Sequence, residues 1–247
     1  MIALNRGDKP EYLSEQKALD LTKEFLNTKN SVWSHDSIKT ALMESSSEKC
    51  AYCECSLAIE SNYMEVEHFE HKDKYPEKVV EWNNLLPACK RCNVAKGTHD
   101  VNDEPIINPY VLNPKDHLYF NFYRLKSLSL LGKKTIEVAD LNNSDRVVSA
   151  RIQIGEALAK GIESALDRFE FFIENRIAGR RNKLVGSVKS LLNECQPDAQ
   201  YAALSATVLT SDDDFVELIE QLKVELLWTE EHESLWVAAK KISLHRS

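Results

Sequence analysis

Hydrophobic side chains recur at helical spacing in two segments near the start of the chain. In residues 14–28, Leu and Phe positions repeat every three or four residues, and Ser14 stands where a helix N-cap is expected. Residues 36–44 place their apolar side chains on one helical face in the same way. The pattern therefore predicts two N-terminal helices, of which the second ends in a run of serines.

Short alternating and apolar segments follow these helices. Residues 63–69 alternate and are partly β-branched or aromatic, and residues 84–88 form a short apolar run, which predicts two short strands. No Gly or Pro interrupts residues 90–96, and Gly97 comes directly afterwards, which predicts a short helix that ends at Gly97. Two strands followed by a helix predict a ββα unit.

A second pair of strands is expected after a loop rich in Asn and Pro. The segments His117–Arg124 and Thr135–Ala139 have strand-like composition, and Leu131–Lys134 contains the Gly of an expected turn. We therefore predict a β-hairpin from these segments.

The remainder of the chain has the apolar periodicity of helices. A long helix is expected after Asn142–Ser144, and further helices are expected with breaks near Gly186 and Pro197. Ser211–Asp214 is typical of a helix start, because acidic residues are stabilised at the positive end of the helix dipole. The second half is thus predicted to be mainly helical.

Composition indicates an ordinary globular protein. The chain has 247 residues, of which 43% are hydrophobic and 28% are charged. No apolar run approaches the roughly 18 residues of a membrane span, and the first residues contain no apolar signal core. We therefore expect no membrane association and a reduced, cytoplasmic location, where paired cysteines more often bind metal than form disulfides.

The net charge of −8 is unusual for a protein that binds nucleic acid by itself. Residues 70–100 contain six Lys or Arg and five Asp or Glu, so the net charge of this segment is near zero within an acidic chain. Acidic surfaces elsewhere would repel phosphate. We infer that a partner protein supplies part of any affinity for nucleic acid.

Two Cys-x-x-Cys pairs are the strongest chemical signal. Cys50, Cys53, Cys89 and Cys92 have the spacing of two zinc knuckles, and four thiolates can close one tetrahedral structural zinc site. The alternative is that they are buried free thiols. The correct spacing of both pairs favours the zinc site over this alternative. Cys55 competes with Cys53 through a less favoured Cys-x-Cys spacing.

Three side chains within this cysteine frame predict a second, open site. His68 has a pKa range suited to a general base, while the Glu67 carboxylate and the Asn93 amide oxygen suit a hard divalent cation such as Mg²⁺ or Mn²⁺. Asn84 is expected to position the loop that holds His68, with Asn83 as the alternative. Singly, each residue is as consistent with a solvated or packed side chain; together they favour catalysis.

The direct succession of Glu67 and His68 restricts the geometry of this site. Neighbours on a regular strand face opposite sides, so Glu67 and His68 can share a site only where the strand ends or bulges.

Lys96 and Arg91 are the candidates for binding nucleic-acid phosphates. A second basic cluster at residues 176–183 is better explained as a solvated helix face.

These residues resemble the core of HNH (His-Asn-His) nucleases. The matching elements are the acid–His pair Glu67–His68, the pair Asn84–Leu85, and the helix motif Cys-x-x-Cys-Asn-x-x-Lys over residues 89–96. The acid is Glu rather than the more frequent Asp, and Asn93 replaces the family's final histidine.

The wider pattern over residues 1–110 resembles the PtuB nucleases of Septu-type and retron-associated antiphage systems. Its elements include Arg6, the Cys-Ala-Tyr-Cys knuckle and the Trp-Asn-Asn-Leu-Leu-Pro-Ala-Cys string at residues 82–89. The resemblance implies an endonuclease that works with a PtuA-like ABC/SMC-type ATPase on DNA or on RNA such as tRNA.

We therefore expect an α+β fold with a zinc-stapled ββα-metal core, N-terminal helices, a β-hairpin and a mainly helical C-terminal half. Residues 1–110 are predicted to be the nuclease domain, and residues 111–247 a region for partner docking. Trp228 and Trp236 are candidate anchors because a spacing of eight residues suits one helix face, while packing in the core explains them at least as well. The alternatives are a non-catalytic zinc-knuckle scaffold and a stand-alone restriction-type HNH nuclease.

Overall fold

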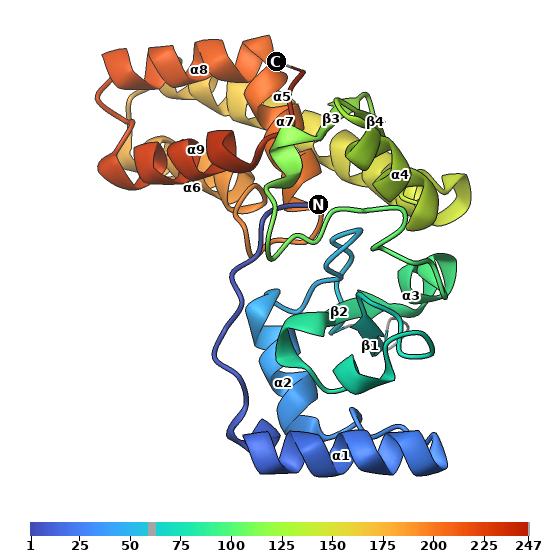
Figure 1. Ribbon diagram of the computed structural model, residues 1–247. Helices are drawn as coiled ribbons and strands as arrows, with labels where there is room; N and C mark the ends of the chain where they lie inside the picture. The colour runs from blue at the N-terminus through green and yellow to red at the C-terminus, as the bar shows by residue number, and fades with distance from the viewer. Residues whose placement is uncertain (59–62, 247) are drawn as a thin grey trace. The chain divides into compact units, whose positions relative to one another are not determined.

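The computed structural model describes residues 1–58 and 63–246. The chain divides into two compact units (Figure 1). The first unit comprises Met1–Leu118 with Leu125–Asn142, and the second comprises Tyr119–Arg124 with Asn143–Ser247. The functional division predicted at residue 110 stays a prediction.

The first unit combines short helices with a small sheet. In chain order its helices and strands are α1 (Glu15–Thr28), α2 (Asp36–Ser45), β1 (Met64–His68), β2 (Leu85–Cys89), α3 (Lys90–Lys96) and α4 (Leu130–Val138). Short 3₁₀ turns lie at Glu11–Leu13, Pro76–Lys78, Trp82–Asn84 and Pro114–Asp116. The predicted N-terminal helices and the ββα order are both present.

The N-terminal helices form the packing support of the sheet. Ser14 caps α1 by accepting a hydrogen bond from the Lys17 amide, as the sequence predicts. Apolar side chains of α1 and α2, among them Phe25 and Ile38, are buried in one cluster with Val66 of β1 and Leu85 of β2. Burial of this helical face fixes the sheet from one side.

β1 and β2 pair antiparallel with a register that places Met64 opposite Cys89 and His68 opposite Leu85. All five residues of β2 are buried, which agrees with its continuous apolar sequence. Pro87 lies in this strand but still contributes, since its carbonyl accepts a hydrogen bond from the Ala51 amide at 2.9 Å. Helix α3 begins directly after β2 and ends at Gly97, whose φ of +49° favours glycine.

The predicted hairpin is present, but its boundaries were wrong. The strands are β3 (Leu118–Asn121) and β4 (Arg124–Ser127), whereas Thr135 and its neighbours belong to helix α4. Two side chains explain the difference. Ser129 caps α4 by accepting from the Gly132 amide at 3.1 Å, and the Thr135 hydroxyl donates to the Leu131 carbonyl at 2.7 Å.

The second unit is helical. A π-helical turn at Ser144–Val148, capped by Asn143, leads into α5 (Ser149–Glu174), and the following helices are α6 (Ala178–Asn193), α7 (Ala202–Ser211), α8 (Asp213–Val224) and α9 (Glu230–Ile242). Asp212 caps α8 by accepting from the Phe215 amide at 2.8 Å, as the acidic start predicts. Aliphatic and aromatic side chains from all five helices share one buried core.

Two predictions about this unit were wrong. Gly186 lies inside α6 and does not interrupt it, because a single glycine weakens a helix without ending it. Trp228 and Trp236 do not share a helix face: Trp228 precedes α9, and Trp236 is buried in the core next to Phe215. Trp236 is therefore unsuited to anchor a partner.

Across residues 1–58 and 63–246, no helix combines the length and apolar character that crossing a bilayer requires.

Two glycines give opposite expectations on substitution. In Gly132→Ala, the new Cβ would lie 2.2 Å from the His117 carbonyl oxygen, a backbone atom that cannot move freely. We expect a loss of about 1–3 kcal/mol in the free energy of unfolding. Gly186→Ala meets no atom within 4 Å and should stabilise by about 0.5–1 kcal/mol. Urea unfolding of both variants tests this, and an unchanged Gly132→Ala would contradict the close approach.

Candidate active site and cysteine cluster

Four thiols from separate segments converge beside the sheet. Cys50 and Cys53 lie before β1, Cys89 ends β2, and Cys92 lies in the first turn of α3. Their sulfur atoms all lie within 4.8 Å of one another, and all four side chains are buried. The sequence-predicted set is thus brought together in three dimensions.

The spacing of these sulfurs fits a tetrahedral metal centre. A zinc ion with four Zn–S bonds of about 2.3 Å has S–S edges of about 3.8 Å, and Cys53 Sγ lies 3.8 Å from Cys89 Sγ. Arg91 Nη2 donates to Cys92 Sγ at 3.1 Å, which favours a negatively charged sulfur. Cys55 is buried nearby, and its carbonyl closes the first knuckle by accepting from the Cys50 amide.

A separate cavity of about 340 Å³ opens at the end of β1. Glu65, Glu67 and His68 of β1 and Asn93 of α3 line it. Trp33, Lys39, His71 and Lys72 are among the other lining residues. Three residues predicted for catalysis or metal binding therefore share one cavity, and β1 ends at His68, which allows both Glu67 and His68 to face it.

A hydrogen bond determines which ring nitrogen of His68 carries the proton. His68 Nε2 lies 2.9 Å from the Val79 carbonyl oxygen, and because a carbonyl can only accept, Nε2 must carry the proton. This leaves Nδ1 as the acceptor of the neutral ring. Burial lowers the pKa of His68 to about 4, and the edge of the ring packs against Trp33 at 4.6 Å between centroids.

Glu67 is held from behind by Lys96. Both side chains are buried, and Lys96 Nζ lies 2.6 Å from Glu67 Oε1 in an ion pair. The same ammonium donates to the His68 carbonyl at 2.9 Å. Burial raises the pKa of Glu67 to about 7, while the charge of Lys96 opposes this rise. Lys96 thus fixes the position of the carboxylate and of the strand end together.

Glu65 is a cavity residue that the sequence reasoning missed. Asn93 Nδ2 donates to Glu65 Oε2 at 2.7 Å. Because an ionised carboxylate only accepts, the nitrogen of Asn93 must face Glu65 and its oxygen Oδ1 must point away. The signal was present in the sequence, since Glu65 lies two residues before Glu67 and side chains at this spacing share one strand face.

Asn84 ties the segment after β1 to the start of β2. Its Oδ1 accepts from the Glu70 amide at 2.7 Å, and its Nδ2 donates to the carbonyls of Glu70 and Lys78 at 3.0 and 3.1 Å. Asn84 does not line the cavity of His68. Its contacts fit the predicted positioning role, because they fix the segment whose Val79 carbonyl orients His68.

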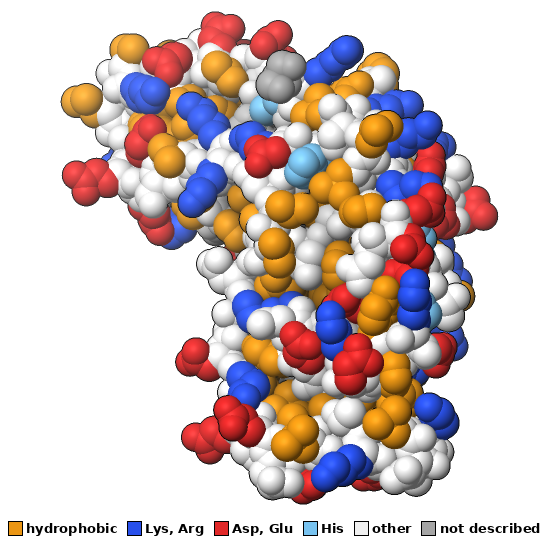
Figure 2. Space-filling view, viewed as in Figure 1, with side chains coloured by type: hydrophobic (Ala, Val, Ile, Leu, Met, Phe, Trp, Pro, Cys, Tyr) orange, Lys and Arg blue, Asp and Glu red, His pale blue; other side chains and the backbone are white. Residues whose placement is uncertain are grey.

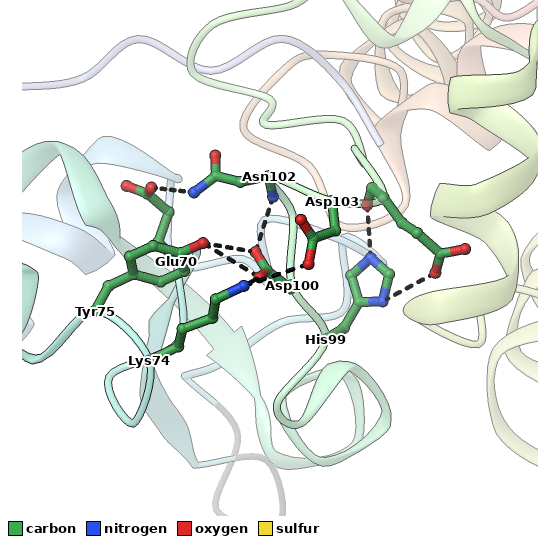
Figure 3. A network of polar contacts seen from close by, with 8 residues as sticks. Glu70, Lys74, Tyr75, His99, Asp100, Asn102 and Asp103 are labelled. Carbon is green, nitrogen blue, oxygen red and sulfur yellow. Dashed lines mark hydrogen bonds and ion pairs between the residues drawn. The ribbon is translucent and has the colours of Figure 1, made fainter.

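A second polar network binds the same segment (Figure 3). Lys74 and Tyr75, which follow β1, both bind Asp100, which follows α3; the tyrosine hydroxyl donates to Asp100 Oδ1 at 3.0 Å. Asn102 donates to Glu70 Oε1 at 2.7 Å. Hydrogen bonds and ion pairs therefore join the segment after β1 to the segment after α3.

The residues predicted to bind phosphate are engaged elsewhere in this structure. Lys96 is 2% exposed and pairs with Glu67, and Arg91 donates to the Asp140 carbonyl at 2.8 Å beside the cysteine cluster. Two members of the basic cluster at residues 176–183 also have acidic partners: Arg176 pairs with Glu225, and Arg180 with Glu174.

Comparisons with known proteins identify the family. The HNH endonuclease family profile matches residues 50–99, which contain both the cysteine cluster and the cavity residues of β1 and α3. A Septu protein PtuB of Bacillus thuringiensis is 46% identical over 243 residues, covering 98% of this chain and 94% of that protein. Another from Bacillus mycoides (strain KBAB4) is 26% identical over 84% of this chain and 87% of its own length. No solved structure gives a significant match. The chain therefore belongs to the PtuB family of Septu proteins and is an HNH endonuclease.

Proposed function

We propose that this endonuclease hydrolyses nucleic-acid phosphodiester bonds with His68 as the general base and a divalent cation held by Glu67 and Asn93. The observation that carries the proposal is the 2.9 Å hydrogen bond from His68 Nε2 to the Val79 carbonyl. It leaves Nδ1 free to accept a proton inside a cavity that Glu67 and Asn93 also line.

The donor set suits Mg²⁺ or Mn²⁺. Glu67 offers a carboxylate oxygen and Asn93 an amide oxygen, and hard divalent cations prefer oxygen ligands while keeping several positions for water and substrate. A cation bound there supplies positive charge where the phosphoryl and leaving oxygens become more negative. Lys96 occupies Glu67 Oε1, so the second carboxylate oxygen is the candidate ligand.

Each protein group then has a defined part in the reaction. His68 Nδ1 removes a proton from the attacking water as its oxygen bonds to phosphorus, and the bond from phosphorus to the 3′-oxygen breaks. The leaving 3′-oxygen takes a proton from a solvent water molecule, so the products carry a 5′-phosphate and a 3′-hydroxyl. The Val79 carbonyl stabilises the imidazolium that forms, because it already accepts from Nε2. Glu65 positions Asn93 by accepting from its amide nitrogen.

We further propose that the four cysteines bind a structural Zn²⁺. This ion would join the turn before β1 to the end of β2 and the first turn of α3. The 3.8 Å spacing of Cys53 and Cys89 sulfurs supports it.

The proposal places the enzyme in antiphage defence, in the cytoplasm, with a PtuA-like ABC/SMC-type ATPase as partner. Support comes from the relatives' name, Septu protein PtuB, and from the net charge of −8, which is unfavourable for independent binding to nucleic acid. DNA and RNA such as tRNA are both substrates that the site chemistry accommodates, because the reacting group is the phosphodiester.

The zinc assignment predicts a specific metal loss. The purified chain should contain about one zinc per molecule, and Cys89→Ser should lose it and lower the Tm by roughly 10 °C or more, since a structural zinc contributes several kcal/mol. Cys195→Ser is the matched control, because Cys195 is a buried thiol of the helical core. Elemental analysis and thermal unfolding test this; full zinc content in Cys89→Ser would contradict it.

The general-base assignment predicts that His68→Ala lowers cleavage by about 10²–10⁴-fold. The assay uses the chain co-purified with its ATPase, Mg²⁺ or Mn²⁺, and plasmid DNA and total tRNA in parallel. His245→Ala is the control, since His245 bonds to Thr210 in the second unit. Equal cleavage by His68→Ala and the parent would exclude His68 as the base.

The Glu65–Asn93 hydrogen bond predicts coupled effects on Mn²⁺ affinity, measured by electron paramagnetic resonance on zinc-loaded protein. Asn93→Ala should weaken Mn²⁺ binding most, and Glu65→Ala by about 10-fold, as expected for a residue that orients a ligand. If Glu65 acts only through Asn93, the double variant should bind Mn²⁺ like Asn93→Ala alone. Additive losses would instead make Glu65 a direct ligand. Exposed Glu77→Gln controls for the change in charge.

A further inference from the structure

Two lysine side chains line the cavity of His68 and have no part in the proposed hydrolysis. Lys39 lies on α2 and Lys72 follows β1, and both line the cavity together with Glu65, Glu67 and His68. They come from segments on either side of the strand in sequence. The cavity therefore has basic groups on its wall as well as acidic ones.

These two lysines differ from four other cations between β1 and the end of α3. Lys74, Lys78, Lys96 and Arg91 all pair with acidic side chains. Within residues 1–58 and 63–246, neither Lys39 nor Lys72 has an acidic partner within ion-pair distance. Neither ammonium is therefore held in an ion pair by the described residues, and each can approach an anion that enters the cavity.

Trp33 sets the position of one of them. The Lys72 ammonium lies 5.4 Å from the centroid of the Trp33 ring, which attracts it through a cation–π interaction. The same ring packs edge-on against His68. Lys72 is thus held near the catalytic base. Burial lowers the pKa of His68 and the charge of Lys72 adds to this, whereas for Glu67 burial raises the pKa and the charge of Lys72 opposes the rise.

The charges of the cavity match a metal-bound phosphate. Glu65 and Glu67 are balanced by Lys39 and Lys72, so a divalent cation would leave the cavity with an excess of positive charge. This contrasts with the net charge of −8 over the chain. On the face visible in Figure 2, Lys or Arg and Asp or Glu side chains are interspersed over the helical unit rather than gathered into one basic region.

We propose that Lys39 and Lys72 form the phosphate-binding wall of the active site and hold the nucleic-acid backbone beside the scissile bond. The proposal rests on the proposed nuclease function and replaces Lys96 and Arg91, whose side chains are engaged internally, as the contacts to phosphate. It involves no base recognition, so it applies to any nucleic acid whose backbone enters the cavity.

The test measures binding of the full-length chain, co-purified with its ATPase, to a 20-base-pair DNA duplex and to an RNA hairpin by fluorescence anisotropy. Binding is followed over a series of KCl concentrations at one fixed concentration of Mg²⁺, in a His68→Ala background that prevents cleavage. A lysine that neutralises one phosphate should lower the salt slope by about one when it is removed. We expect this for Lys39→Ala and for Lys72→Ala, with an affinity loss that is similar across probe sequences.

Three controls make the result specific. Lys90→Ala removes an exposed cation of α3 that does not line the cavity and should leave the slope unchanged. Lys39→Arg and Lys72→Arg should keep the slope of the parent, because the positive charge remains. Thermal unfolding of each variant should match the parent, which separates lost contacts from lost folding.

The outcomes distinguish the two proposals. Unchanged slopes in both alanine variants, or no binding of either probe by the parent, would overturn the phosphate-binding wall whatever the cleavage assay gives. Lower slopes in both variants, with a parent that cleaves no substrate, would support the wall and reject the nuclease mechanism. A lower slope with only one probe would identify that nucleic acid as the one that enters the cavity.

Discussion

The antiparallel pairing of β1 with β2 and the cysteine cluster at its end form the constraint on which the site depends. Cys89 ends β2 directly opposite Met64, so the thiol cluster lies at one end of the sheet and His68 at the other. The strands have only five residues each, so contacts outside the sheet, among them the four sulfurs and the packing of α1 and α2, contribute to fixing their register. A metal at the cysteines would make that register rigid.

Buried polar contacts fix the positions of Glu67 and His68 at the end of this sheet. Lys96 links Glu67 to the His68 carbonyl, and Val79 orients the His68 ring. In the segment before β2, the half-buried Arg6 guanidinium donates to the Trp82 carbonyl at 3.0 Å and stacks on Tyr110 at 3.7 Å from the ring centroid. Such contacts hold the reacting groups in place before substrate arrives, which is the main requirement for electrostatic catalysis.

Local signals made part of this structure predictable from sequence. The Ser14 cap, the Gly97 stop and the cysteine spacing depend on neighbouring residues, and each predicted its feature correctly. The family resemblance, carried by the motifs of residues 67–96 and the wider pattern of residues 1–110, was confirmed by the comparisons. The hairpin was misplaced because capping by Ser129 outweighs the strand-like composition that follows it.

The partners of charged side chains were less predictable. Lys96 has the position of a phosphate contact in the motif, yet it is buried against Glu67, because burial is decided by packing of α3 on β1. Glu65 became a candidate only when its 2.7 Å contact with Asn93 was visible. Such choices depend on contacts between segments distant in sequence, which no local pattern records.

The most direct measurement is a crystal structure of the chain grown with Mn²⁺, with anomalous diffraction recorded at the zinc and manganese edges. The account predicts a zinc signal enclosed by Cys50, Cys53, Cys89 and Cys92, and a manganese signal bonded to Glu67 and Asn93 beside His68. Manganese at another position, with the cavity of His68 containing no metal signal, would contradict the claim that this fold joins a structural metal to a separate catalytic one.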